Sequence, residues 1–402
     1  MNNKRFYELD SLRGIAAISV VFHHCLLAFS VFLLAHKHTA VENIFLNIFT
    51  YSPLHILWAG HEAVILFFIL SGFVLALAFL KENKPTYLTY IIKRFCRIYL
   101  PYIITIFVSI ALYSFLGQND NKQLSYWFND MWSSPVTFET LLHFLLMTGI
   151  DTHNINTVTW TLVLELRISI IFPFLMYFIN RYSFTPLLTF GGLAWALIYL
   201  GTTYASWHIN NGMIATFLAV FAQTVYYTIF FILGALLAKY LDVVIAFFKQ
   251  TRKAYKYVLM TLCIILYTIE WNFPVLGQLK YAGNFVASKF IIDFFISVGV
   301  IILFVFVIST KELKTFLNKK SFLFLGKISY SLYLIHPIVL LVYVFFFQNL
   351  LPLYSIIIVV PLLSVLLSVV YYQYVELPSM TLGKKLTSIK LLKVKVKMEK
   401  SA

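Results

Sequence analysis

Long apolar runs recur along the whole chain, and short polar segments separate them. A run of about twenty apolar residues crosses roughly 30 Å of hydrocarbon as one helix. The pattern therefore predicts an all-α, polytopic membrane helical bundle of about ten transmembrane helices. The expected spans are 12–34, 60–80, 92–116, 158–179, 186–206, 213–239, 255–271, 288–309, 328–349 and 353–375.

The composition supports a membrane protein. The chain is 61% hydrophobic and only 12% charged, and its mean hydropathy is +0.85. Soluble globular chains are far less apolar and carry about twice as many charges. No polar stretch is long enough for a separate soluble domain of ~50 residues. We expect one transmembrane domain over 1–383 and a basic, disordered cytoplasmic tail over 384–402.

The basic residues indicate how the chain is oriented. The net charge is +15, but lysines and arginines are concentrated in alternate loops, which is the positive-inside pattern. This distribution places both termini in the cytoplasm and argues against a nucleic-acid partner. The three cysteines have no metal-like spacing, so neither a disulfide framework nor a metal site is expected.

The first predicted span contains ionisable residues at a depth where they are costly. Arg13 lies at the water edge, and the pair His23 and His24 follows near the bilayer centre. Arg13 and His24 are eleven positions apart, which places them on one helix stripe, whereas His23 points about 100° away. Buried ionisable groups within a membrane mark functional sites by default, so His24 is a candidate site residue.

Two further spans carry polar stripes. Thr161, Glu165 and Ser169 recur at i, i+4 and i+8, and a carboxylate within a membrane must be neutral, paired or wet. Ser329, Tyr333 and His336 share another helix face. Polar stripes on several neighbouring helices are what is needed to line a water-accessible tunnel through the bundle.

Two other elements allow two interpretations each. Arg94 and Arg97 are i, i+3 and give one helix end a cationic face, which is typical of membrane anchoring but also suits phosphate binding. Ser71 lies beside Gly72, and small residues such as these let helices approach closely. For Ser71, a role in helix packing and a role in a polar site are equally consistent with the sequence.

Six short motifs occur in one order along the chain. They are Asp10 to His24 with Arg13 within it, Phe67 to Phe73, Arg94 and Arg97 before Pro101, Trp160 to Glu165, Ser329 to His336, and Val375 to Pro378. Together they resemble the motifs of the acyltransferase-3 family of integral membrane acyltransferases, over nearly the whole chain. Ser11, Lys93 and the pair Leu166-Arg167 depart from the family pattern and leave substrate details open.

The resemblance implies a function and its partners. Members of the family move an acyl group, commonly acetyl, from cytoplasmic acyl-CoA to a hydroxyl of an extracytoplasmic or lipid-linked glycan. We therefore expect an O-acetyltransferase of the cell inner membrane that modifies surface polysaccharide, uses acyl-CoA as co-substrate and needs no metal. The expected partners are the lipid bilayer and a saccharide acceptor, and a homo-oligomer is left open.

The resemblance also assigns roles to residues. His24 would activate the acceptor hydroxyl or relay the acyl group, because neutral imidazole is a good base and nucleophile near pH 7. Glu165 and His336 would orient or deprotonate the acceptor on the outer side. The CoA phosphates would be held by Arg13, Arg94 and Arg97. The expected substrate contacts are Ser71, Trp160, Ser329 and Tyr333.

Two other classes of function are consistent with the residues alone. A proton- or anion-coupled transporter would use the same polar stripes to line a permeation path, and it would move a solute without cleaving a thioester. A structural scaffold would leave His24, Glu165 and His336 without a role. The residues also leave both direct transfer and an acyl-histidine intermediate open.

Overall fold

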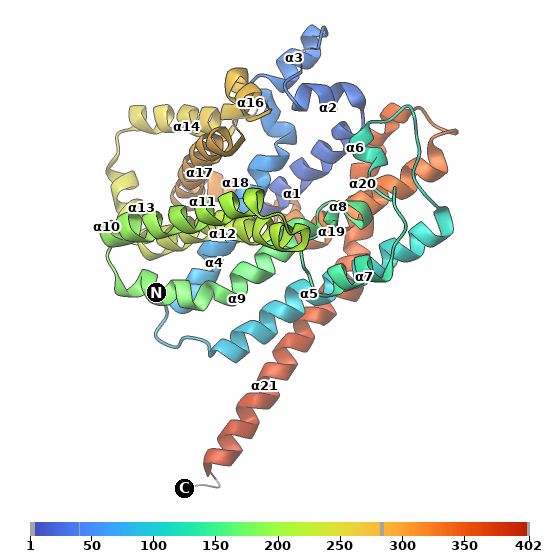
Figure 1. The fold of residues 1–402 in the computed structure, drawn as a ribbon. Coiled ribbons are helices and arrows are strands. Elements are labelled where there is room, and N and C mark those ends of the chain that lie inside the picture. The colour runs from blue at the N-terminus through green and yellow to red at the C-terminus, as the bar shows by residue number, and fades with distance from the viewer. Residues whose placement is uncertain (1–4, 40, 282–284, 400–402) are drawn as a thin grey trace.

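The computed structural model describes residues 5–39, 41–281 and 285–399, and these residues form helices without any strand. This is the predicted all-α, polytopic membrane bundle (Figure 1). Eight helical segments of the described chain are long and apolar enough to cross a membrane. They are α4 (Gly60–Phe79), α5 (Tyr87–Leu116), α9 (Thr159–Arg181), Phe184–His208, α12 (Gly212–Lys239), Ala287–Ser309 of α17 (Phe285–Ser309), α19 (Lys320–Phe347) and Leu353–Ser388.

Two of the expected spans differ from this set in form. The first is divided into α1 (Tyr7–Leu27) and α2 (Ser30–His36), which are bent by 114° relative to each other, and the pair counts as a ninth span if taken together. The expected span 255–271 forms α14 (Lys253–Tyr267), of 15 residues. A helix of that length covers only about 22 Å, less than the ~30 Å of hydrocarbon.

Helix α1 is packed directly against α19, and it also contacts α4 and α20 (Ile356–Tyr371). The close approach of α1 and α19 depends on two glycines that face each other. A Cβ atom at Gly14 would overlap the backbone of Leu325 and Gly326, and one at Gly326 would overlap the backbone of Asp10. This glycine crossing holds the two helices at backbone contact.

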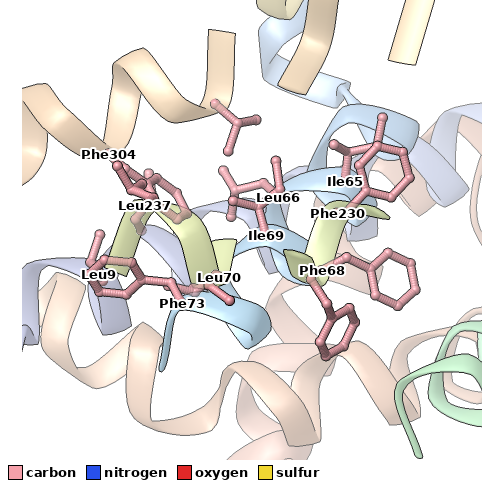
Figure 2. Packing of buried hydrophobic residues seen from close by; sticks show 14 of the residues in the cluster. Leu9, Ile65, Leu66, Phe68, Ile69, Leu70, Phe73, Phe230, Leu237 and Phe304 are labelled. Atoms are coloured by element: carbon pink, nitrogen blue, oxygen red, sulfur yellow. The ribbon is translucent and has the colours of Figure 1, made fainter. Parts of the chain in front are cut away.

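The main hydrophobic core lies around α4, where it packs against α12 and α17 (Figure 2). Phe68, Ile69 and Phe73 of α4 are buried there, together with Phe230 of α12 and Phe304 of α17. These helices are apolar on nearly every face, as expected for spans enclosed by other spans. The core therefore fixes α4 rigidly between α1 and α12.

Short helices cover one end of the bundle, and the C-terminal helix leaves from the other (Figure 1). We call the covered end the outer cap. It consists of α2, α3 (Ile44–Thr50), η1 (Pro53–Trp58), α15 (Ile269–Asn272) and α16 (Pro274–Tyr281).

Helix α21 (Leu377–Glu399) packs along α5, where Gly383 lies against Cys96. It contains most of the expected tail 384–402, of which residues 400–402 lie outside the described residues. The boundary between a domain over 1–383 and a tail, and the cytoplasmic location of both termini, stay predictions.

Candidate active site

Two cavities of different chemical character open within the bundle. The first, the histidine cavity, has a volume of about 410 Å³ and lies toward the outer cap. Its polar and aromatic lining consists of His23, His24, His36, Lys37, His61, Tyr126, Trp127, Thr152, His153, Thr157, Trp160, Tyr281 and Tyr333. The second, the cationic cavity, has a volume of about 600 Å³ and lies toward the opposite end. Its charged lining consists of Arg5, Asp10, Arg13, Arg94, Arg97, Glu165, Lys327, Glu376 and Lys384.

His24 of α1 and His336 of α19 form a hydrogen-bonded pair beside the histidine cavity. The distance between His24 Nδ1 and His336 Nε2 is 2.7 Å, and the rings stack with their centroids 5.0 Å apart. The two residues are far apart in sequence and meet because the glycine crossing at Gly14 and Gly326 brings α1 against α19. His24 lines the cavity, whereas His336 is 1% exposed and lies behind it.

The hydrogen bonds around this pair fix the positions of its protons. His336 Nδ1 lies 3.1 Å from the carbonyl oxygen of Leu332, which can only accept, so Nδ1 carries the proton of neutral His336. His336 Nε2 is then an acceptor, and His24 Nδ1 must donate to it. The lone pair of neutral His24 is left on Nε2, where it is available as a base or nucleophile.

Two other histidines of the cavity are hydrogen-bonded to neutral groups. The His23 Nδ1–H donates to the carbonyl oxygen of Trp58 at 2.9 Å. His153 Nε2 donates to the carbonyl oxygen of Trp127 at 3.3 Å, and its Nδ1 lies 2.6 Å from Thr157 Oγ1. These bonds orient both imidazoles without providing a negative charge.

Glu165 lies in the cationic cavity, where Arg94 binds it. Arg94 Nη2 donates to Glu165 Oε1 at 2.7 Å, and the same guanidinium donates to Ser169 at 3.1 and 3.2 Å. Ser71 Oγ lies 3.4 Å from the same carboxylate oxygen. The structure thus joins three residues of the expected site, and it places Glu165 in the cationic cavity, apart from His24, which lines the histidine cavity.

The cationic cavity has more positive than negative side chains. Six cations line it against three carboxylates, namely Asp10, Glu165 and Glu376. Arg5 is paired with Asp10 at 2.9 Å, as Arg94 is with Glu165. Arg13 and Arg97 have no carboxylate within ion-pair distance among the described residues. The cavity is therefore suited to a polyanionic ligand.

The two cavities meet at Val64 and Tyr333, which line both. Tyr333 projects from α19 one turn before His336, and its hydroxyl lies 2.9 Å from Thr161 Oγ1 of α9. Its ring and that of Phe67 pack edge to face, with the centroids 5.6 Å apart. Tyr333 and Val64 therefore lie between the arginines of the cationic cavity and the histidines.

Comparison with known protein families decides the class of this protein. A family model described as an acyltransferase domain, that of acyltransferase-3, matches residues 6–373, nearly the whole chain. The chain belongs to the acyltransferase-3 family. No curated protein and no solved structure matches it. The protein is thus a membrane acyltransferase, which confirms the resemblance seen in its motifs.

In this acyltransferase the expected substrate contacts are divided between the two cavities. Ser71 and Ser329 line the cationic cavity, Trp160 lines the histidine cavity, and Tyr333 lines both. Sequence reasoning missed most of the histidine cavity, because His36 and His153 belong to short segments outside the long spans. Their one visible signal was the unusual frequency of histidine near the expected outer loops.

The outer cap of the acyltransferase contains a buried ion pair. Lys280 Nζ donates to both oxygens of Glu270, at 2.9 and 3.1 Å, and the carboxylate is 1% exposed. Burial alone would lower the pKa of Lys280, but the Glu270 carboxylate outweighs it and raises this pKa above its ordinary value. The ammonium group therefore stays charged, and the pair ties α15 to α16, whose Tyr281 closes one side of the histidine cavity.

Proposed function

We propose that this acyltransferase moves an acyl group, in the simplest case acetyl, from acyl-CoA to a sugar hydroxyl of a cell-surface or lipid-linked polysaccharide. The observation that carries the proposal is the meeting of two chemically different cavities at Tyr333, with the His24–His336 pair beside the junction. A transporter needs no hydrogen-bonded nucleophile there. A transferase needs one, together with separate sites for a charged donor and a neutral acceptor.

The donor fits the cationic cavity. CoA carries a diphosphate and a further phosphate, and arginine guanidiniums bind phosphates in a bidentate manner. Because Glu165 already binds Arg94, we assign phosphate binding to Arg13 and Arg97, with Lys327 beside them. A cavity of about 600 Å³ is in the range of small-molecule sites.

The positive-inside pattern supports a cytoplasmic opening for the donor. The cationic cavity is lined by Arg5 and Arg13 near the start of α1 and by Lys384 of α21. The distribution of basic loops places both of these segments on the cytoplasmic side of the membrane. In that orientation the outer cap faces away from the cytoplasm, and the protein is a multi-pass protein of the cell inner membrane.

The acceptor fits the histidine cavity. Trp127 and Trp160 give it flat apolar walls, on which the C–H face of a sugar ring can pack. Thr152, Thr157 and His153 provide hydrogen-bonding groups at the same wall. A site of this kind, with aromatic walls and several hydrogen-bonding groups, orients a neutral hydroxyl compound.

His24 performs the central chemistry in either of two routes. In direct transfer, its Nε2 takes the acceptor proton while the hydroxyl oxygen attacks the thioester carbonyl and the CoA thiolate leaves. In the relay route, Nε2 attacks the thioester carbonyl first, the thiolate leaves, and the acyl-imidazole then passes the acyl group to the acceptor oxygen. His336 acts as a positioning residue in both, because it holds the proton on His24 Nδ1.

The test uses purified protein in liposomes with radiolabelled acetyl-CoA and a cell-envelope glycan extract on opposite sides of the membrane. We expect ester-linked label on the glycan when acetyl-CoA is added to the side that carries the cationic cavity. No release of CoA with any acyl donor would contradict the proposal. So would movement of a solute across the membrane without thioester cleavage, which would favour a transporter.

A further inference from the structure

A buried carboxylate in α17 holds one histidine of the histidine cavity from behind. Asp293 Oδ1 lies 2.6 Å from Nε2 of His61, the second residue of α4. The other oxygen, Oδ2, accepts a hydrogen bond of 2.6 Å from the hydroxyl of Tyr226. Asp293 is 1% exposed, so both of its oxygens are used inside the protein rather than by water.

The carboxylate fixes the tautomer of this imidazole. Asp293 accepts at Oδ1, so Nε2 of neutral His61 carries the proton, and the lone pair lies on Nδ1. Nδ1 has no hydrogen-bond partner within residues 5–39, 41–281 and 285–399, and the ring lines the cavity with its side chain 20% exposed. His61 therefore presents an unused base to the space assigned to the acceptor.

His61 differs from the other histidines of this cavity in what stabilises a positive charge on it. His23 donates to a neutral carbonyl, and His24 donates to a neutral imidazole. The nearest carboxylate of His153 is the exposed Asp130, at 3.6 Å. Only His61, among these described histidines, is hydrogen-bonded to a buried carboxylate, and this arrangement stabilises an imidazolium once it has formed.

A purely structural role explains the contact less well. A carboxylate within a membrane-spanning helix is costly, and such groups are usually found where they serve a function. The contact between α4 and α17 could be made by apolar packing alone, as it is about three helical turns further along at Phe73 and Phe304. The arrangement of hydroxyl, carboxylate and imidazole instead matches the logic of a positioned general base.

We infer that His61 is the base that takes the proton of the acceptor hydroxyl in the relay route, in which His24 is the nucleophile, with Asp293 and Tyr226 as positioning residues of His61. The inference rests on the proposed function and divides its chemistry between two histidines. The acceptor O–H bond breaks and its proton moves to His61 Nδ1, while the acceptor oxygen forms a bond to the acyl carbon. The bond from that carbon to His24 Nε2 breaks at the same time, and its electron pair returns to Nε2.

The division of labour can be tested with two acceptors that differ in their need for a base. A sugar hydroxyl must lose its proton as it attacks, whereas neutral hydroxylamine attacks through its lone pair and loses a proton afterwards. The purified protein receives acetyl-CoA and either the cell-envelope glycan extract or hydroxylamine. The products are ester-linked acetate and acetohydroxamate, each corrected for the reaction without protein.

His61→Gln keeps an N–H that can donate to Asp293 but removes the base. We expect its kcat for ester formation to fall about 10²- to 10⁴-fold, the usual contribution of general base catalysis. Acetohydroxamate formation and KM for acetyl-CoA should stay near their wild-type values. Asp293→Asn should give a smaller loss of ester formation, about 10- to 100-fold, again with hydroxamate formation retained. His208→Gln, on the exposed end of α11 (Gly192–His208), is the matched control and should equal wild type.

The outcomes separate the inference from the proposed function. Ester formation at the wild-type rate by His61→Gln would overturn the inference alone. An equal loss of ester and hydroxamate would also overturn it, because a structural defect affects both acceptors. A wild-type protein that forms no ester with the glycan extract would overturn the proposed function, and the inference with it.

Discussion

The two cavities of this acyltransferase differ in the charge of the groups that line them. The cationic cavity has six positive side chains and three carboxylates, whereas imidazoles and aromatic rings dominate the histidine cavity. Guanidiniums bind phosphates, but a nearby positive charge also opposes the protonation of an imidazole. Separating the two groups therefore lets one cavity hold a polyanion while the other accepts a proton.

One helix connects the two environments. Arg13 lies in the cationic cavity and His24 in the histidine cavity, about 16 Å further along α1 at 1.5 Å per residue. A donor anchored by its phosphates at one end must therefore present its thioester at the other. The comparison of the cavities predicts that substitutions in the two regions affect different kinetic constants.

The largest effect is expected at His24. His24→Gln keeps a side chain of similar length but removes the nucleophile or base, so we expect glycan acetylation to fall at least about 10³-fold. His336→Gln should lose less, about 10- to 100-fold, because His336 acts through His24. Both rates are measured with radiolabelled acetyl-CoA and glycan extract. If His336→Gln lowers the rate of glycan acetylation as much as His24→Gln does, then His336 is more than a positioning residue.

A smaller and different effect is expected at Arg97. Loss of one charge-assisted hydrogen bond to phosphate is worth about 1.5–3 kcal/mol, so Arg97→Gln should raise KM for acetyl-CoA about 10- to 150-fold. The value of kcat should change little. S-acetyl-N-acetylcysteamine, a thioester without phosphates, is the control donor, and its KM should be the same for both proteins. An equal rise in the KM values of both donors would show that Arg97 does not bind the CoA phosphates.

Periodicity along single helices made part of this arrangement predictable from the sequence. The spacing of Arg13 and His24 indicated one polar stripe, and the structure places the two residues on one helix that lines both cavities. The apolar runs predicted the long spans, because a membrane imposes a length on each of them. The ordered motifs identified the family, and the family model confirms it.

Contacts between distant segments were beyond the reach of such patterns. Glu165 is bound by Arg94 because α5 and α9 pack together, and no spacing within either helix indicates that pair. His61 and Asp293 are likewise brought together only by the packing of α4 against α17. Helix α14 ends at Tyr267, before the apolar run does. The hydropathy of the run therefore gave no sign that the helix is shorter than the expected span.

The position of Glu165 yields a third prediction that sharpens the contrast between the cavities. If Glu165 only neutralises Arg94 beside the donor, Glu165→Gln should lower KM for acetyl-CoA by up to about tenfold, because the freed Arg94 guanidinium gains a charge-assisted hydrogen bond to phosphate worth ~1.5 kcal/mol. The apparent KM for the glycan extract should stay unchanged. Steady-state kinetics with each substrate varied in turn measures both constants. A rise in the apparent KM for the glycan extract alone would instead support the acceptor-binding role that we expected for Glu165 from the sequence.

The smallest effect is expected at the junction itself. Tyr333→Phe keeps the ring that lies between the cavities and removes only the hydrogen bond to Thr161, worth about 1 kcal/mol, so glycan acetylation should fall about fivefold or less.

Tyr333→Ala removes the ring as well, and it should widen the passage between Val64 and Phe67. We then expect butyryl-CoA to gain activity relative to acetyl-CoA, because the passage beside His24 limits acyl length only while the ring is present. The ratio of the two donors' kcat/KM values measures this. If the ratio is the same in Tyr333→Ala, Tyr333→Phe and wild type, then the thioester reaches His24 by a path that does not pass Tyr333, and the two cavities are not the two halves of one transfer route.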